Sequence, residues 1–203
     1  MYEIALSGLV GYIIGSLSPS ALLSKIKKEN FRKQGTGNLG ATNTMIILGK
    51  GYGAFVMFFD IFKAFAAFML ATKLFPQFEH SGLLAGVFAV IGHIFPFYLK
   101  FRGGKGLAAF GGLILSFDPF IFLLLLILTL ILMFLFNYGV AMPISAAVLF
   151  PILAFLKTKN LAVFALTLVA SVLIIFKHIP NLKKAVNKDD ATVRDYLKKL
   201  SKS

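Results

Sequence analysis

The 203-residue chain is too apolar for a soluble protein of its size, because 58% of its residues are hydrophobic and only 14% are charged, whereas soluble domains are about 45–50% apolar and about 25% charged. The absence of cysteine excludes disulfide bonds, thiolate metal sites and cysteine nucleophiles. The formal net charge of +13 is typical of a membrane protein whose inner loops are basic and contact anionic lipid. Binding of an anionic substrate is a second explanation, and both can apply.

Seven apolar segments predict an all-α, polytopic integral membrane protein that forms a single domain over residues 1–203. The expected spans are residues 3–23, 51–72, 81–98, 106–117, 119–136, 139–156 and 161–177, with a basic tail at 178–203. The first segment contains Glu3 and lacks a small-residue cleavage site, so we interpret it as a transmembrane helix and not as a signal peptide. Because the basic residues flank apolar spans, nucleic-acid binding is not expected.

The stretch 106–156 can hold two long helices or three shorter ones, since both Asp118-Pro119 and Asn137-Tyr138-Gly139 indicate turns. Three helices put the basic loops and the basic tail on one side, as the positive-inside tendency requires. We therefore predict seven transmembrane helices, with the N-terminus outside and the C-terminus cytoplasmic. The fourth segment would rise only about 18 Å against a hydrocarbon core of about 30 Å, so its glycine-rich start is expected inside the protein.

A first segment with chemical potential is the inner loop at residues 35–43. Its glycines allow backbone N–H groups to turn towards an anion, and its hydroxyl and amide side chains add further donors. An ordinary flexible loop is the alternative interpretation. The residues expected to bind a phosphate are Gly35, Thr36, Gly37, Asn38, Gly40, Thr42 and Asn43.

A second segment, residues 92–106, ends in a Gly-Gly-Lys-Gly run before an expected helix. Free N–H groups and partial positive charge at a helix N-terminus favour phosphate, and Lys105 adds a full charge. This is not a Walker loop, since the long glycine spacing and the following Ser/Thr are missing; a basic interfacial hairpin is the alternative. The candidate residues are His93, Arg102, Gly103, Gly104, Lys105 and Gly106.

A third segment, residues 177–184, lies where the last span leaves the membrane. His178 and Asn181 are three residues apart and would share one side of a helical turn, although Pro180 can also start a new helix there. An interfacial anchor is the plainer interpretation of a single histidine. Within the second span, Asp60 and Lys63 are also three apart, and we interpret them as a structural ion pair because buried membrane charges are costly unless paired.

Together these segments resemble the bacterial PlsY family of acyl-phosphate:glycerol-3-phosphate acyltransferases. The family pattern Gly-Ser-Gly-Asn-x-Gly-Ala-Thr-Asn-x-x-Arg begins here at Gly35, and the pattern Gly-His-x-Phe-Pro with a later Phe-x-Gly-Gly-Lys-Gly-x-Ala-Thr runs over residues 92–109. The His-x-x-Asn pattern falls on His178 and Asn181, and Asp60-Ile61-Phe62-Lys63 looks like the family's second span. The similarity covers nearly the whole chain in the same order.

The resemblance implies transfer of an acyl group from acyl phosphate to the 1-hydroxyl of glycerol 3-phosphate, which yields lysophosphatidic acid and phosphate. It implies no metal, nucleotide or other cofactor, a site on the cytoplasmic face of the bacterial inner membrane, and partners limited to the two substrates and membrane lipids; a monomer is expected. The glycine segments with Lys105 would cradle the acyl phosphate, while His178 and Asn181 would position glycerol 3-phosphate. The base is His178 or, preferably, an oxygen of the acyl phosphate itself. The expected catalytic residues are Thr36, Lys105, His178 and Asn181, with Lys184 as a further phosphate-binding residue.

The chain departs from the family pattern at four positions: Thr36 for serine, Ile46 for arginine, Ala109 for threonine and Asp190 for glutamate. Thr36 keeps a hydroxyl, but isoleucine cannot bind phosphate bidentately as arginine does. Loss of that contact would cost about 1.5–3 kcal/mol unless Lys50, Arg32 or Lys33 compensates. A weakened paralogue that binds acyl phosphate or anionic lipid is therefore the alternative function. A small anion transporter is a third hypothesis, although the chain shows no inverted repeat of broken helices.

Overall fold

The computed structural model describes residues 2–189 and 192–195, and the regular structure of these residues is entirely helical. The chain divides into two compact units, residues 1–117 and 118–203, and each is described by itself. The expectation of a single domain stays a prediction.

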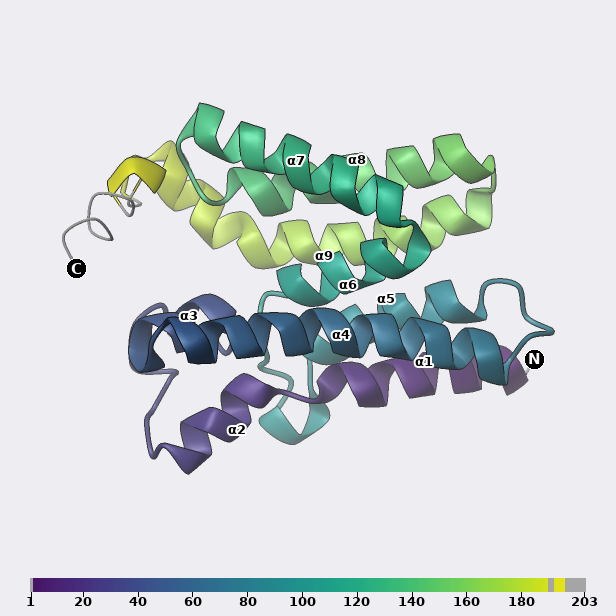
Figure 1. Cartoon of the computed structure of the whole chain (residues 1–203), viewed down its shortest axis with the longest axis horizontal. Helices are drawn as coiled ribbons and strands as arrows, with labels where there is room; N and C mark the ends of the chain where they lie inside the picture. The colour runs from purple at the N-terminus through teal and green to yellow at the C-terminus, as the bar shows by residue number, and fades with distance from the viewer. Residues whose placement is uncertain (1, 190–191, 196–203) are drawn as a thin grey trace. The chain divides into compact units, whose positions relative to one another are not determined.

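The first unit packs around one almost wholly buried helix, α5, in which only Phe88 and Ile91 are not buried. Helices α1 and α4 both contact α5 and each other, α6 packs against α4 and α5, and the short α3 lies on α4 (Figure 1). The elements of this unit are α1 (Tyr2–Ser16), α2 (Pro19–Ile26), α3 (Ala41–Leu48), α4 (Lys50–Leu74), α5 (Ser81–Ile94), the 3₁₀ turn η1 (Phe97–Leu99) and α6 (Leu107–Phe117).

Glycines four residues apart allow α1 to approach α5 closely. A Cβ atom placed at Gly11 would overlap the carbonyl oxygen of Ala85, and one placed at Gly15 would overlap that of Ala89. Small residues at such spacing let two backbones touch, which is how helices associate in an apolar medium. The packing of α1 on α5 thus depends on the missing side chains.

The second unit is an antiparallel run of α7 (Pro119–Phe136), α8 (Ala141–Thr158) and α9 (Leu161–Val186), with α8 packed on both neighbours. Asp118 caps α7 by accepting hydrogen bonds from the backbone N–H groups of Phe120 (2.7 Å) and Ile121 (2.9 Å). Its other carboxylate oxygen forms an ion pair with Lys157 near the end of α8. The aspartate that suggested a turn therefore both starts a helix and ties it to the next one.

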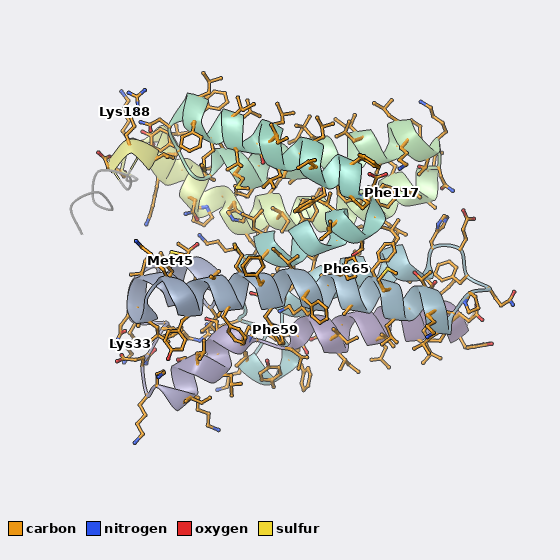
Figure 2. All side chains as sticks on the ribbon, viewed as in Figure 1. Lys33, Met45, Phe59, Phe65, Phe117 and Lys188 are labelled. Atoms are coloured by element: carbon orange, nitrogen blue, oxygen red, sulfur yellow. The ribbon has the colours of Figure 1, made fainter. Side chains whose placement is uncertain are left out.

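Six helical segments are long and apolar enough to cross a membrane, and a seventh, α6, is apolar but shorter. Many of their large apolar side chains are exposed, including Phe120 at 84%, and Figure 2 shows side chains projecting outward along the helices. Such surface requires an apolar surrounding. The prediction of an all-α integral membrane protein is confirmed, while the number of crossings and the orientation stay predictions.

Two expected boundaries differ from the structure. The first span is interrupted at Leu17 and Ser18, where Ser18 caps the following helix and Pro19 occupies its first turn. The last span was expected to end at residue 177, but α9 continues to Val186 with Pro180 inside it. The possibility that Pro180 starts a new helix is therefore wrong, because one proline removes a single backbone donor and the turns on both sides hold the helix together.

Replacing Gly15 with alanine is expected to lower the stability of the first unit by about 1–3 kcal/mol, because the added methyl group meets a backbone carbonyl that cannot move aside. Thermal unfolding in detergent measures the effect. Gly51→Ala is the matched control, since no atom lies within 4 Å of a Cβ at that helical position, and it should leave stability unchanged or raise it by about 0.4–1 kcal/mol. Equal melting temperatures for the two variants would contradict this account of the helix contact.

Candidate active site

The first glycine segment is a loop that runs directly into α3, so Thr42 and Asn43 lie on the first helical turn and not in the loop. Gly35 and Gly37 adopt φ values of +57° and +70°, which favour glycine. Thr36 and Thr42 are exposed, and Asn38 is half-buried. Figure 2 labels Lys33 and Met45 on either side of this segment.

Asn43 holds this loop in shape from inside. Its Oδ1 accepts a hydrogen bond from the Thr36 backbone N–H (2.6 Å), and its Nδ2 donates to the carbonyl oxygen of Phe31 (2.8 Å). Phe31 is fully buried, as is Asn43. The buried amide thus ties the loop to the core, while Thr36 and Thr42 stay exposed; its own role as a phosphate ligand stays a prediction.

The second glycine segment folds back onto the end of α5. The backbone N–H of Gly103 donates to Ile94 (3.0 Å), and that of Gly104 donates to His93 (3.1 Å). Lys100 and Phe101 take left-handed conformations that reverse the chain, and Gly106 has a φ of +92°. Because α6 starts at Leu107, Lys105 lies just before the N-terminus of a helix, where the sequence predicts it.

The two glycine segments meet, although about 65 residues separate them in the sequence. A Cβ atom at Gly104 would lie 2.6 Å from the carbonyl oxygen of Leu39 and would overlap His93 Nε2. The Arg32 guanidinium donates a hydrogen bond to the carbonyl oxygen of Arg102. The backbone of Gly104 is therefore held between a loop carbonyl and an imidazole ring, a space that no other residue type fits.

A buried charge cluster lies beneath this contact. The Lys63 ammonium is 2.6 Å from Asp60 Oδ1 and 3.0 Å from His93 Nδ1, and it donates a 2.6 Å hydrogen bond to the carbonyl oxygen of Leu17. All three side chains are buried. The predicted ion pair is confirmed, whereas its partner His93 was missed because only the packing of α4 on α5 brings it there.

The third segment lies on α9 in the second unit, so its meeting with the glycine segments stays a prediction. His178 is buried, and its Nδ1 lies 2.8 Å from the carbonyl oxygen of Ile174. Because a carbonyl oxygen only accepts, Nδ1 carries a proton. Asn181 follows on the same continuous helix, half-buried, and Lys184 is exposed one turn later; Asp190 lies outside the described residues.

Ile46 lies on α3 with 53% of its surface exposed, at the position where the resemblance implies an arginine. Arg32, Lys33 and Lys50 are the cations expected to compensate for this arginine. Arg32 contacts the second glycine segment through its hydrogen bond to the Arg102 carbonyl oxygen. Lys33 and Lys50 are exposed. The structure shows no cation in direct replacement of the missing arginine among the described residues.

The family model "Glycerol-3-phosphate acyltransferase" matches residues 5–188 of this chain. The chain belongs to this family. The acyltransferase is 32% identical over 200 residues to the glycerol-3-phosphate acyltransferase of Staphylococcus carnosus, covering 94% of this chain and 98% of the relative. It is 33% identical over 195 residues to the enzyme of the same name from Bacillus subtilis, with the same coverage.

Solved structures agree with this assignment. The crystal structure of PlsY, an integral membrane glycerol 3-phosphate acyltransferase, in its glycerol 3-phosphate form superposes with a TM-score of 0.85 at 28% identity, covering 93% of the acyltransferase and 94% of that chain. A lysophosphatidic acid form of PlsY gives a TM-score of 0.83. The resemblance to the PlsY family and the predicted enzyme class are confirmed, and an anion transporter is not supported.

Replacing Gly104 with alanine is expected to reduce acyltransferase activity about a hundredfold, since the added methyl group must displace the chain segment that carries Lys105, and misplacement by about 1 Å costs that much. Activity of the purified variant is compared with Gly139→Ala, a control at which a Cβ meets no atom within 4 Å. Full activity of the alanine variant at position 104 would show that the contact with His93 is not needed.

Proposed function

We propose that this glycerol-3-phosphate acyltransferase uses an acyl phosphate as donor and acylates the 1-hydroxyl of glycerol 3-phosphate, giving lysophosphatidic acid and inorganic phosphate. The observation that carries the proposal is the meeting of the two glycine segments at Gly104, with Lys105 at the start of α6. The N–H groups of the first turn of α6, together with Lys105, would form one anion-binding surface. PlsY, the solved relative, is described in forms with glycerol 3-phosphate and with lysophosphatidic acid.

The chemistry requires mainly placement, because an acyl phosphate is already activated. The hydroxyl oxygen of the acceptor attacks the carbonyl carbon, and the bond from that carbon to the phosphate oxygen breaks with its electron pair going to phosphate. Lys105 and the N–H groups at the start of α6 stabilise the negative charge that develops. The hydroxyl proton passes to an oxygen of the departing phosphate, which needs no dedicated protein base.

Thr36, His178 and Asn181 complete the proposed machinery. The exposed hydroxyl of Thr36 donates to a phosphate oxygen, as the serine of the family pattern would. His178 and Asn181 bind and orient glycerol 3-phosphate, and Nε2 of His178 is the alternative acceptor for the hydroxyl proton, since Nδ1 donates to the Ile174 carbonyl oxygen. Lys184 neutralises further phosphate charge, and the apolar helices hold the acyl chain.

A catalytically weakened paralogue is the second candidate function, and Ile46 is the observation that favours it. Such a protein would bind an acyl phosphate through the glycine segments without transferring the acyl group efficiently. Activity with both substrates decides between the two functions, because binding alone releases no phosphate.

We further propose seven membrane crossings, with the N-terminus outside and all three motif segments on the cytoplasmic side of the bacterial inner membrane. The distribution of basic residues supports this orientation. The short helix α6 would complete its crossing inside the protein, where its glycine-rich start is covered by other chain segments.

The proposed orientation predicts which introduced cysteines react with a membrane-impermeant maleimide in spheroplasts; the natural chain has no cysteine to interfere. Glu79→Cys and Lys159→Cys should react in sealed spheroplasts, whereas Lys28→Cys and Lys188→Cys should react only after lysis. A chain in which α6 does not cross would reverse the results at positions 159 and 188 while leaving those at 28 and 79 unchanged.

Lys105→Ala is expected to lower kcat/KM about 10²–10³-fold, because a full charge aimed at the developing phosphate charge is lost. The purified enzyme is mixed with palmitoyl phosphate and glycerol 3-phosphate, and phosphate and lysophosphatidic acid are both followed. Lys73→Ala, which removes a charge from the end of α4 remote in sequence from the motifs, is the matched control. Wild-type protein that binds palmitoyl phosphate but forms no product would identify the weakened paralogue.

A further inference from the structure

Three groups surround the Lys63 ammonium, one as an ion-pair partner and two as hydrogen-bond partners. They are Asp60 Oδ1 at 2.6 Å, the Leu17 carbonyl oxygen at 2.6 Å and His93 Nδ1 at 3.0 Å. An ammonium group only donates, so His93 Nδ1 must accept and the ring proton lies on Nε2. His93 Nδ1 and Asp60 Oδ1 lie 3.3 Å apart. Neither donates to the other, and both contact the same Lys63 ammonium.

This cluster connects three separate parts of the chain. Leu17 lies at the break between α1 and α2, Asp60 and Lys63 lie on α4, and His93 lies at the end of α5. Lys63 supplies a donor to a carbonyl group that the interrupted first span leaves without a helical partner. The charges therefore hold the end of α5 in a fixed place relative to α4 and to the helix break.

His93 in turn determines where Gly103 and Gly104 lie. Its carbonyl oxygen accepts from the Gly104 N–H, and its Nε2 edge occupies the space that a side chain at position 104 would fill. Gly104 is bonded directly to Lys105, so rotation of the imidazole ring would shift the residue to which the proposed function assigns the phosphate contact. Contact passes from Lys63 to His93, from His93 to Gly104, and from Gly104 to Lys105.

Stability alone does not explain a buried ion pair in a membrane-spanning segment. An apolar pair of similar volume often stabilises a protein equally well, whereas removal of one partner leaves a costly isolated charge. We propose that Asp60, Lys63 and His93 are positioning residues for acyl transfer, which fix the Gly103–Gly104 backbone and thereby aim Lys105. The proposal rests on the proposed function of Lys105, and none of the three residues needs to touch the substrate.

The double variant Asp60→Leu/Lys63→Met tests this proposal because it removes both charges and leaves neither one unpaired. We expect its melting temperature in detergent to stay close to that of the wild type, while kcat with palmitoyl phosphate falls about a hundredfold. Lys157→Met, which removes an ion-pair partner of Asp118 in the second unit, is the control and should keep kcat within about twofold. A stable double variant with wild-type kcat would overturn the proposal.

A pair of variants at His93 keeps the test decisive if the double variant does not fold. The side-chain oxygen of asparagine reaches the position of Nδ1 and can accept from Lys63, whereas the amide nitrogen of glutamine reaches the position of Nε2. If His93 positions the loop through Lys63, His93→Asn should retain about tenfold more activity than His93→Gln. The opposite order would mean that His93 donates directly to substrate and would overturn the proposal.

Inorganic phosphate probes the anion-binding site without depending on the identity of the acyl donor. Stabilisation of each His93 variant by phosphate in thermal unfolding should follow the same order as kcat, with asparagine above glutamine. A wild-type protein that binds phosphate but does not use palmitoyl phosphate would refute the proposed acyl donor. In that case the stabilisation of the two His93 variants by phosphate still tests the positioning role. Wild-type transfer with equal phosphate binding and equal activity in both variants would refute the positioning role alone.

Discussion

One ammonium group joins the parts of the first unit that the site needs. Lys63 contacts the broken first span through Leu17, its own helix through Asp60 and the end of α5 through His93. A charge in an apolar surrounding is tolerated when it is paired and hydrogen-bonded, so each of these contacts constrains the other two. Movement of α5 relative to α4 would leave a buried proton without an acceptor, and this requirement keeps the backbone beneath the second glycine segment in place.

Both the fold and the site also depend on glycines, whose lack of a side chain allows close backbone contacts. Gly11 and Gly15 allow α1 to touch the backbone of α5, and Gly104 allows the loop before α6 to pass between Leu39 and the His93 ring. In both places the neighbour is backbone or a held ring, so no rearrangement could accommodate a methyl group.

The reaction asks little of a protein beyond these features. In the proposed reaction the acyl phosphate carries its own activation, so catalysis would depend on holding two phosphorylated, negatively charged molecules next to each other. A net charge of +13, concentrated in loops and tail, offsets their repulsion and also suits anionic lipid headgroups. The same basic residues thus suit both the proposed substrates and the membrane.

The sequence by itself determined the apolar helices, the Asp60–Lys63 pair and the place of Lys105 before a helix, because these depend on residues within a few positions of each other and on helical periodicity. It also carried the family, through motifs that the comparisons confirm. Only the tertiary structure decided that His93 completes the charge cluster, that Asn43 braces its own loop and that α9 continues through Pro180. The partners of His93 and Asn43 depend on which buried groups lie opposite each other across packed segments. The continuation of α9 depends on whether the helix on both sides of Pro180 outweighs one missing hydrogen bond. No local sequence pattern encodes these outcomes.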